Sequence, residues 1–149
     1  MMKYQGSVLV AGERSATLLN RKTGLTQAGF EVETANTEAD AVAKARRIHP
    51  NVALIESNSA DFDPYRLCSL LRADPHTAAL PIMVLDGLGA EVPEEIDDLV
   101  QQPAPDAIVV ARMQELVRLA TIQDEAACRI RTAKAFRVDV ARSGPPKLA

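Results

Sequence analysis

Two kinds of hydrophobic pattern alternate along this chain. Short, nearly continuous apolar runs have the length of buried strands, and between them apolar residues recur every three or four positions, as in amphipathic helices. One segment, residues 30–34, alternates apolar and charged residues, which is typical of a half-exposed edge strand. The pattern predicts five strands, at residues 8–11, 30–34, 52–55, 81–85 and 107–110, each followed by a helix.

Capping residues and prolines set the bounds of the predicted helices. Ser15 and Thr37 are suitable N-caps for the first two, and an Asp-Pro step at residues 63–64 is a specific start signal for the third. The fourth is short and acidic and follows Pro93, and the fifth begins near Arg112. We therefore expect helices over residues 15–28, 37–48, 63–74, 94–100 and 112–135.

The fold class follows from these elements. Strands this rich in apolar residues leave neither face of the sheet in water, so the sheet should be parallel and covered on both sides. We predict an α/β fold, a doubly wound sheet of five parallel strands with an extended C-terminal helix. Residues 1–120 should form this domain, and residues 121–149 a helical extension and a linker to a further domain, because residues 143–146 read SGPP.

Composition excludes several classes of protein. The 149 residues carry a net charge of -3, with 47% hydrophobic and 25% charged residues, which is ordinary for a globular domain. No apolar run approaches the about 20 residues that a membrane span needs, and the first residues lack the apolar core of a secretory signal. Two cysteines cannot form a disulfide framework, so a cytoplasmic location is expected.

Charge is unevenly distributed along the chain. Residues 126–149 hold six Lys or Arg and one acidic residue, so the remainder is acidic. Such a basic segment can be a nucleic-acid arm or a solvated tail. We expect no nucleic acid to be bound, because no recognition motif accompanies the segment and only five Phe or Tyr are available for stacking on bases.

The candidate site lies at the carboxyl ends of the predicted strands, where parallel α/β sheets bind their ligands. Glu13, Glu56 and Asp86 end or follow three of these strands, so three carboxylates should converge there. Carboxylate oxygens are ligands for Mg²⁺, which is one interpretation of the cluster. The other is that polar residues end strands by chance.

These segments, in this order and spacing, resemble the receiver domains of two-component response regulators over residues 7–119. The most specific stretches are residues 50–56, 63–75 and 79–85, which read PNVALIE, DPYRLCSLLRADP and ALPIMVL. The resemblance implies a flavodoxin-like (βα)5 fold and a role in signal transduction. In active members of the family, an aspartate that ends the third strand accepts a phosphoryl group.

The sequence departs from the family's site at nearly every position. Active members hold Mg²⁺ on two acids after the first strand, end the fourth strand with Ser or Thr, and end the fifth with Lys followed by Pro. An aromatic residue in the fifth strand reports the switch. By resemblance, the corresponding residues are Glu56 for the phosphoacceptor, Gly12 and Glu13 for the acid pair, Asp86 for the hydroxyl, Val110 for the lysine and Ala107 for the aromatic residue.

Without the lysine, Glu56 lies among other carboxylates that repel a dianionic phosphoryl group. We therefore expect no phosphotransfer, no catalytic residue, no enzymatic activity and no resident cofactor, with Mg²⁺ as the weaker alternative. Glu56 then either stands in permanently for a charged, phosphorylated-like state or is a solvated carboxylate that pairs with Arg14 or Arg112.

The resemblance implies a degenerate receiver that acts in bacterial signalling by binding proteins. The expected partners are a second copy, through the fourth helix, fifth strand and fifth helix, and an output domain or another signalling protein, with cyclic-di-GMP output as one option. The last helix carries an apolar stripe that extends past the domain and needs a partner. The interface candidates are Glu94, Glu95, Asp98, Leu116, Leu119, Ile122 and Ile130.

Two other functions compete with this interpretation. One is an active receiver in which Glu56 accepts phosphate with unusual ligands, and phosphate uptake separates it from a degenerate receiver. The other is an unrelated small-molecule binder of the same fold, which needs a well-formed apolar cavity beside Glu13 and Glu56.

Overall fold

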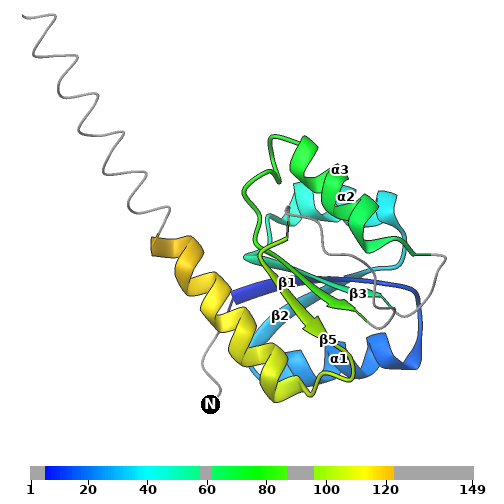
Figure 1. The fold of residues 1–149 in the computed structure, drawn as a ribbon, viewed down its shortest axis with the longest axis vertical. Coiled ribbons are helices and arrows are strands. Elements are labelled where there is room, and N and C mark those ends of the chain that lie inside the picture. Colours follow the sequence, from blue (N-terminus) through cyan, green and yellow to red (C-terminus); the bar gives the residue numbers. More distant parts are fainter. Residues whose placement is uncertain (1–5, 58–61, 87–95, 123–149) are drawn as a thin grey trace, which may run out of the picture. The chain divides into compact units, whose positions relative to one another are not determined.

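Five parallel strands and four helices make up the part of the chain that the computed structural model describes, residues 6–57, 62–86 and 96–122. The strands lie in the order β2-β1-β3-β4-β5, so β2 and β5 are the edges of the sheet (Figure 1). The elements are β1 (Gly6–Ala11), α1 (Ala16–Gln27), β2 (Phe30–Ala35), α2 (Glu38–Ile48), β3 (Val52–Ser57), α3 (Pro64–Ala73), β4 (Ile82–Asp86), β5 (Asp98–Gln101) and a C-terminal helix at residues 106–122.

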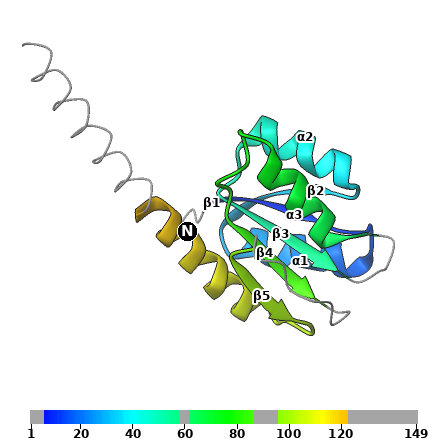
Figure 2. The same ribbon diagram turned by 45° about the horizontal axis from the view of Figure 1, so that its top comes forward.

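Helices cover both faces of the sheet. α2 and α3 lie on one face, and α1 and the C-terminal helix lie on the other (Figures 1 and 2). Alternate residues of each strand enter one of two hydrophobic cores, as the pleat of a strand requires. Leu9 and Ile55 pack with the α2 and α3 side, whereas Val10 and Leu54 pack with the other. The predicted fold class, a doubly wound parallel α/β sheet, is confirmed.

Local sequence signals set the first three helices, as predicted. The side chains of Ser15, Thr37 and Asp63 each accept a hydrogen bond from a backbone N–H two or three residues further on, at 3.0–3.2 Å. These bonds satisfy N–H groups that the first turn of a helix leaves without a partner. The four strands predicted before residue 86 also lie where the apolar runs placed them.

The prediction of the fifth strand is wrong. β5 is Asp98–Gln101, which overlaps the segment predicted as a short acidic helix, and residues 107–110 belong to the C-terminal helix. Residues 96 and 97 precede β5 and are not helical, whereas Glu94 and Glu95 lie outside the described residues.

The error has a physical cause at each segment. β5 is a four-residue edge strand with two apolar residues, Leu99 and Val100, between polar neighbours, so it contains no apolar run. The run at 107–110 shows its amphipathic character only together with the residues after it. Val109 and Met113 are fully buried, whereas Ile108 is 47% exposed. Buried residues four positions apart indicate a helix, which a run of four apolar residues cannot reveal alone.

The chain divides into two units, Met1–Val117 and Arg118–Ala149, and the sheet belongs to the first. The second unit is described only at residues 118–122, which are helical and in which Leu119 and Ile122 are exposed. The predicted helix from residue 123 to 135, with Ile130, lies outside the described residues. Within the described part, no helix has both the length and the apolar character needed to span a membrane.

Truncation of Met113 tests the placement of the C-terminal helix. We expect Met113→Ala to lower the free energy of unfolding by about 2–5 kcal/mol, because it leaves a cavity between the helix and the sheet. Ile108→Ala, one turn earlier on the exposed side, should change it by about 0.5 kcal/mol or less. Urea denaturation followed by circular dichroism measures both, and equal effects would contradict the helical register.

Candidate functional site

Glu56 lies in β3 at the edge where three strands end. In the parallel register Ala11 pairs with Ile55 and Ser57 pairs with Asp86, so the carboxyl ends of β1, β3 and β4 lie beside one another. Doubly wound sheets bind their ligands at the carboxyl ends of their strands, at the point where the strand order reverses direction. In this sheet that point lies between β1 and β3.

Glu56 is a buried carboxylate held by an arginine. It is 1% exposed, and its Oε1 accepts a hydrogen bond from Nε of Arg21 at 2.5 Å. Arg21 is itself 8% exposed, so both charges of the ion pair are removed from water. The alternative of a solvated Glu56 that pairs with Arg14 or Arg112 is therefore wrong, and Arg112 binds Asp98 of β5 at 2.9 Å.

The same guanidinium holds a second carboxylate. Nη1 of Arg21 donates to Oδ1 of Asp106 at 2.6 Å, and Asp106 is the first residue of the C-terminal helix. The Asp106 side chain is 47% exposed, so this ion pair faces water while the other is buried. Glu56, Arg21 and Asp106 form a triad that joins β3, α1 and the C-terminal helix.

Arg21 reaches the site because of its place on α1. Leu18, Arg21 and Leu25 are the buried residues of this helix, and their spacing of three and four places them on one face. The aliphatic stem of an arginine can cover apolar surface while its head extends to a polar partner. A charge on an otherwise apolar stripe, between Leu18 and Leu25, is the sequence signal that identifies Arg21, and our sequence analysis missed it.

Gly12 allows the end of β1 to approach Glu56 closely. A Cβ at this position would lie 3.0 Å from the backbone O of Glu56 and 3.5 Å from its Cβ. The Gly12 backbone is fixed from the other side, because its N–H donates to Ala35 O at 3.0 Å and its C=O accepts from Asn36 Nδ2 at 3.2 Å. A larger side chain at position 12 would therefore need its neighbours to shift by a few tenths of an ångström.

The residues present do not fit a receiver-type Mg²⁺ site. Gly12 has no side-chain ligand, Glu13 is exposed, and Oε1 of Glu56 is bound to Arg21. Over residues 6–57, 62–86 and 96–122, no three His, Cys, Asp or Glu side chains gather as a metal ion would require. The carboxylate that Arg21 brings together with Glu56 is Asp106 rather than Glu13. Asp86 ends β4, and its side chain lies outside the described part.

The end of β5 carries a neutral amide. β5 ends at Gln101, and Gln102 and Pro103 follow, joined by a cis peptide bond. Nε2 of Gln102 donates to the backbone O of Leu85 in β4 at 3.0 Å. The fifth strand therefore brings no positive charge to this edge of the sheet, and the cation beside Glu56 comes from α1.

Val110 and Ala107 do not lie at the end of a strand, which corrects their assignment in the sequence analysis. Val110 is half-buried and Ala107 is exposed, both in the C-terminal helix. Gln102 and Pro103 directly follow the end of β5, where the resemblance to receivers leads us to expect the family's Lys and Pro. A polar residue before a proline, shortly after two apolar residues, is the signal that could have located this strand end.

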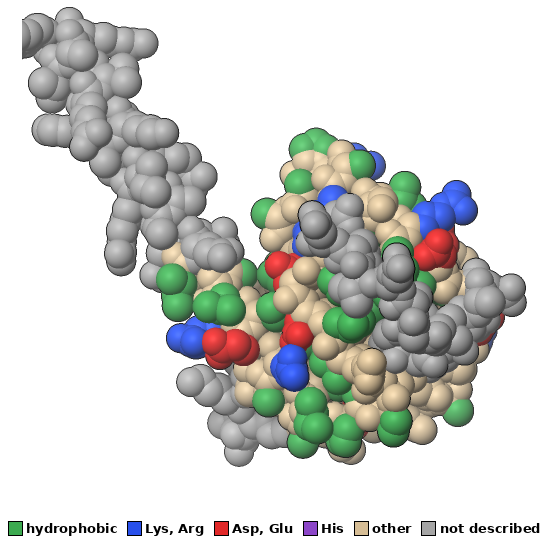
Figure 3. Space-filling model, in the orientation of Figure 1, with side chains coloured by type: hydrophobic (Ala, Val, Ile, Leu, Met, Phe, Trp, Pro, Cys, Tyr) green, Lys and Arg blue, Asp and Glu red, His purple; other side chains and the backbone are tan. Residues whose placement is uncertain are grey.

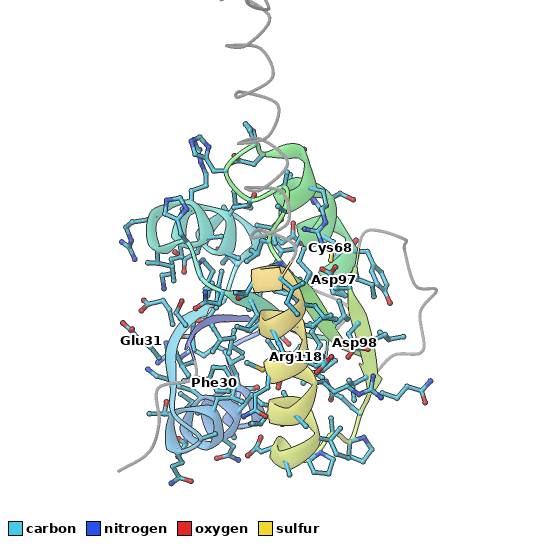
Figure 4. The ribbon with its side chains drawn as sticks, turned by 90° about the vertical axis from the view of Figure 1, so that its left-hand side faces the viewer. Phe30, Glu31, Cys68, Asp97, Asp98 and Arg118 are labelled. Carbon is cyan, nitrogen blue, oxygen red and sulfur yellow. The ribbon has the colours of Figure 1, made fainter. Side chains whose placement is uncertain are left out.

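The interface candidates are only partly described. Asp98 is bound by Arg112, and Leu116 packs half-buried against the core, whereas Leu119 and Ile122 are exposed. Figure 4 shows Asp98 and its neighbour Asp97 along the β5 edge of the sheet. Glu94, Glu95 and Ile130 lie outside the described residues.

Comparison with known proteins places this fold among response regulators. No protein-family profile matches the chain. The chain is 28% identical over 147 residues to the response regulator PleD of Caulobacter vibrioides, which covers 95% of this chain and 32% of PleD. It is 31% identical over 117 residues to the transcriptional regulatory protein PrrA of Mycobacterium leprae, which covers 74% of this chain and 49% of PrrA.

A solved structure agrees with these relatives. A response regulator receiver modulated diguanylate cyclase from Pelobacter carbinolicus matches with a TM-score of 0.68 at 16% identity, covering 80% of this chain and 97% of that chain. The curated relatives and the structural neighbours are thus response regulators and receiver domains, and the fold is the flavodoxin-like fold of receivers. The chain spans about a third of PleD and half of PrrA.

The buried ion pair makes a prediction about stability. We expect Arg21→Met and Glu56→Met each to lower the free energy of unfolding by about 3–5 kcal/mol, because each leaves an uncompensated buried charge. The double variant should recover most of this loss, since it buries no charge. Lys44→Met, which breaks partly exposed pairs with Glu33 and Asp40, should cost about 1 kcal/mol or less. Chemical denaturation measures all four, and additive single effects would rule out the buried pair.

Proposed function

We propose that the chain is a degenerate receiver domain that works in bacterial signal transduction without being phosphorylated and without catalysing a reaction. The observation that carries this proposal is the bond between the buried Glu56 carboxylate and Arg21. In an active receiver the residue at this position is a nucleophile, which must present a free oxygen to phosphorus. Here one carboxylate oxygen is bound by the chain's own cation.

The surroundings of Glu56 support the same conclusion. Phosphoryl transfer depends on metal ions and fixed cations that neutralise charge in the transition state. Gly12 and Gln102 occupy positions at which active receivers carry an acid and a lysine, and neither supplies a metal ligand or a positive charge. Loss of one such stabilising group typically costs about 3–4 kcal/mol of transition-state stabilisation, and two are replaced together.

An active receiver with unusual ligands is the second candidate, and Arg21 is the observation that favours it. The guanidinium is a fixed cation within hydrogen-bond distance of the acceptor position. However, two of its N–H groups already donate hydrogen bonds to Glu56 and Asp106, so a phosphoryl group would have to displace one of these carboxylates. This makes Arg21 a better structural counterion than a phosphate ligand.

The small-molecule alternative has less support. The depression next to the triad is open and is lined by Thr17, Asn20, Arg21, Ala104, Pro105 and Asp106. Four of these six residues are polar or charged, whereas small-molecule sites are mostly enclosed and apolar.

Phosphate uptake tests the proposal directly. We expect no increase in mass by a phosphoryl group when the protein is incubated with acetyl phosphate and Mg²⁺, because Glu56 is bound to Arg21 and no metal site is formed. Intact-protein mass spectrometry measures this, with a receiver that retains the aspartate and the lysine as positive control. Stoichiometric uptake that disappears in Glu56→Gln would instead establish the active receiver.

A role as a protein-interaction module requires a surface for partners. We propose a homodimer through the β5 edge and the C-terminal helix, together with an output domain that the module regulates from the cytoplasm. β5 is an edge strand, and Ile108, Leu119 and Ile122 expose 47%, 43% and 48% of their surfaces. In Figure 3, hydrophobic side chains lie along the lower margin, where Figure 1 places α1 and the beginning of the C-terminal helix.

The output of the module is proposed from its relatives. Similarity to a receiver modulated diguanylate cyclase supports cyclic-di-GMP signalling. Similarity to PrrA, a transcriptional regulatory protein, makes transcriptional control the other option. In either case the chain would transmit a state of its surface rather than a phosphoryl group.

Charge substitutions on the C-terminal helix test the dimer. We expect Leu119→Glu with Ile122→Glu to weaken self-association by at least about 10-fold, because apolar anchors at an interface are typically worth 1 kcal/mol or more each. Leu19→Glu, at a 59% exposed position on α1, is the matched control and should leave it unchanged. Sedimentation equilibrium measures the dissociation constant, and a monomeric wild-type protein would exclude this interface.

A further inference from the structure

We propose that Arg21 couples the carboxylate of Glu56 to the position of the first turn of the C-terminal helix. The proposal goes beyond a role as a phosphorylation-independent module, because it names an internal connection by which the acceptor position affects the helix that leads out of the domain. It stands on three observations: the two arms of the triad, the close approach at Gly24, and the packing of the helix.

The two arms of the triad share one rigid group. Arg21 donates from Nε to Glu56 and from Nη1 to Asp106, at 2.5 and 2.6 Å. A guanidinium is planar, so its N–H groups cannot be reoriented independently. When the Nε–H is directed at the buried carboxylate, the direction of the Nη1–H is fixed as well. The position of Asp106 therefore depends on a bond made at the end of β3.

Gly24 shows how closely the two helices approach. A Cβ at this position, one turn after Arg21 on α1, would overlap the Asp106 carboxylate. Glycine inside a helix is less favourable than alanine, so the local preference of α1 is against it. Here the Asp106 carboxylate occupies the space that a side chain at position 24 would fill. α1 thus provides both the cation and the room for the first residue of the C-terminal helix.

The rest of the C-terminal helix does not depend on the triad. Met113, two turns into the helix, is fully buried and packs in the core with Leu18 and Leu25 of α1. Burial of apolar surface keeps the body of the helix in place. The triad accordingly acts on the first turn, and a change at Glu56 would shift the start of the helix while its body stays packed.

Amide hydrogen exchange tests the coupling. The readout is the exchange rate of the Val109 and Val110 amides, relative to sheet amides such as Val10 and Leu54 that report global unfolding. We expect Asp106→Asn to accelerate exchange of the Val109 and Val110 amides by about two- to fivefold, because it removes an exposed ion pair. Exchange of the sheet amides should stay unchanged. Glu56→Gln should accelerate the exchange of the same two amides relative to the sheet, because Arg21 links residue 56 to Asp106 in the first turn of the helix.

Two further variants keep the test decisive. Gly24→Ala leaves the buried Arg21–Glu56 pair intact and favours α1, so it should accelerate Val109 and Val110 without loss of global stability, even if Glu56→Gln fails to fold. Asp40→Asn is the matched control, because Asp40 is also in a first turn, ion-paired and 45% exposed, but on α2. It should leave Val109 and Val110 unchanged.

The outcomes separate this proposal from the proposed function. Acceleration in Asp106→Asn and Gly24→Ala, and in Glu56→Gln where that variant folds, supports the coupling whether or not the protein takes up phosphate. Unchanged first-turn exchange in Asp106→Asn or in Gly24→Ala overturns it. The proposal is also overturned if Glu56→Gln folds and its Val109 and Val110 amides exchange no faster, relative to the sheet amides, than in the wild-type protein.

Discussion

The removal of the Arg21–Glu56 ion pair from water constrains the site more than any other interaction. A buried carboxylate is expensive unless a charge and hydrogen bonds compensate it, and a buried guanidinium is equally so. Each therefore requires the other, and together they require α1 to present position 21 toward the sheet. Gly12 at the end of β1 lets the chain approach the backbone of Glu56 closely, beside this pair.

Under the proposed function, this arrangement explains how the receiver fold is kept without the chemistry of phosphoryl transfer. The sheet order, the two cores and the helix caps depend on apolar residues and capping side chains that do not take part in phosphoryl transfer. The site at the strand ends depends on a few polar positions that can be replaced without disturbing those cores. On this proposal, Arg21 of α1 balances the charge of Glu56, which active receivers balance at the corresponding position with a metal ion and a lysine.

The sequence was informative where burial decides the structure. Residues 52–55 and 82–85 form strands that are apolar throughout because both faces of the sheet are covered. The pattern was misleading at β5, where Leu99 and Val100 of an edge strand are only partly buried, and at residues 107–110, where four apolar residues belong to an amphipathic helix.

Recognition of the site depended on the family resemblance, and its chemistry depended on a long-range contact. Glu56 could be placed at the acceptor position because the stretch around it is specific. Arg21 lies 35 residues earlier in the chain, and Asp106 lies 85 residues after Arg21, so no local pattern links the three. Only the folded chain brings these charges together, where Arg21 of α1 reaches both Glu56 of β3 and Asp106 of the C-terminal helix.

The side-chain Nε–H of Arg21 reports most directly whether the acceptor position is internally neutralised. Nitrogen-15 NMR of this group, recorded with and without Mg²⁺ and beryllofluoride, should give a signal that is protected from solvent exchange and that does not move on addition of either. A rapidly exchanging Nε–H, together with shifts of the Glu56 carboxylate on addition of Mg²⁺ and beryllofluoride, would show an open acceptor site and contradict the central role of the buried pair.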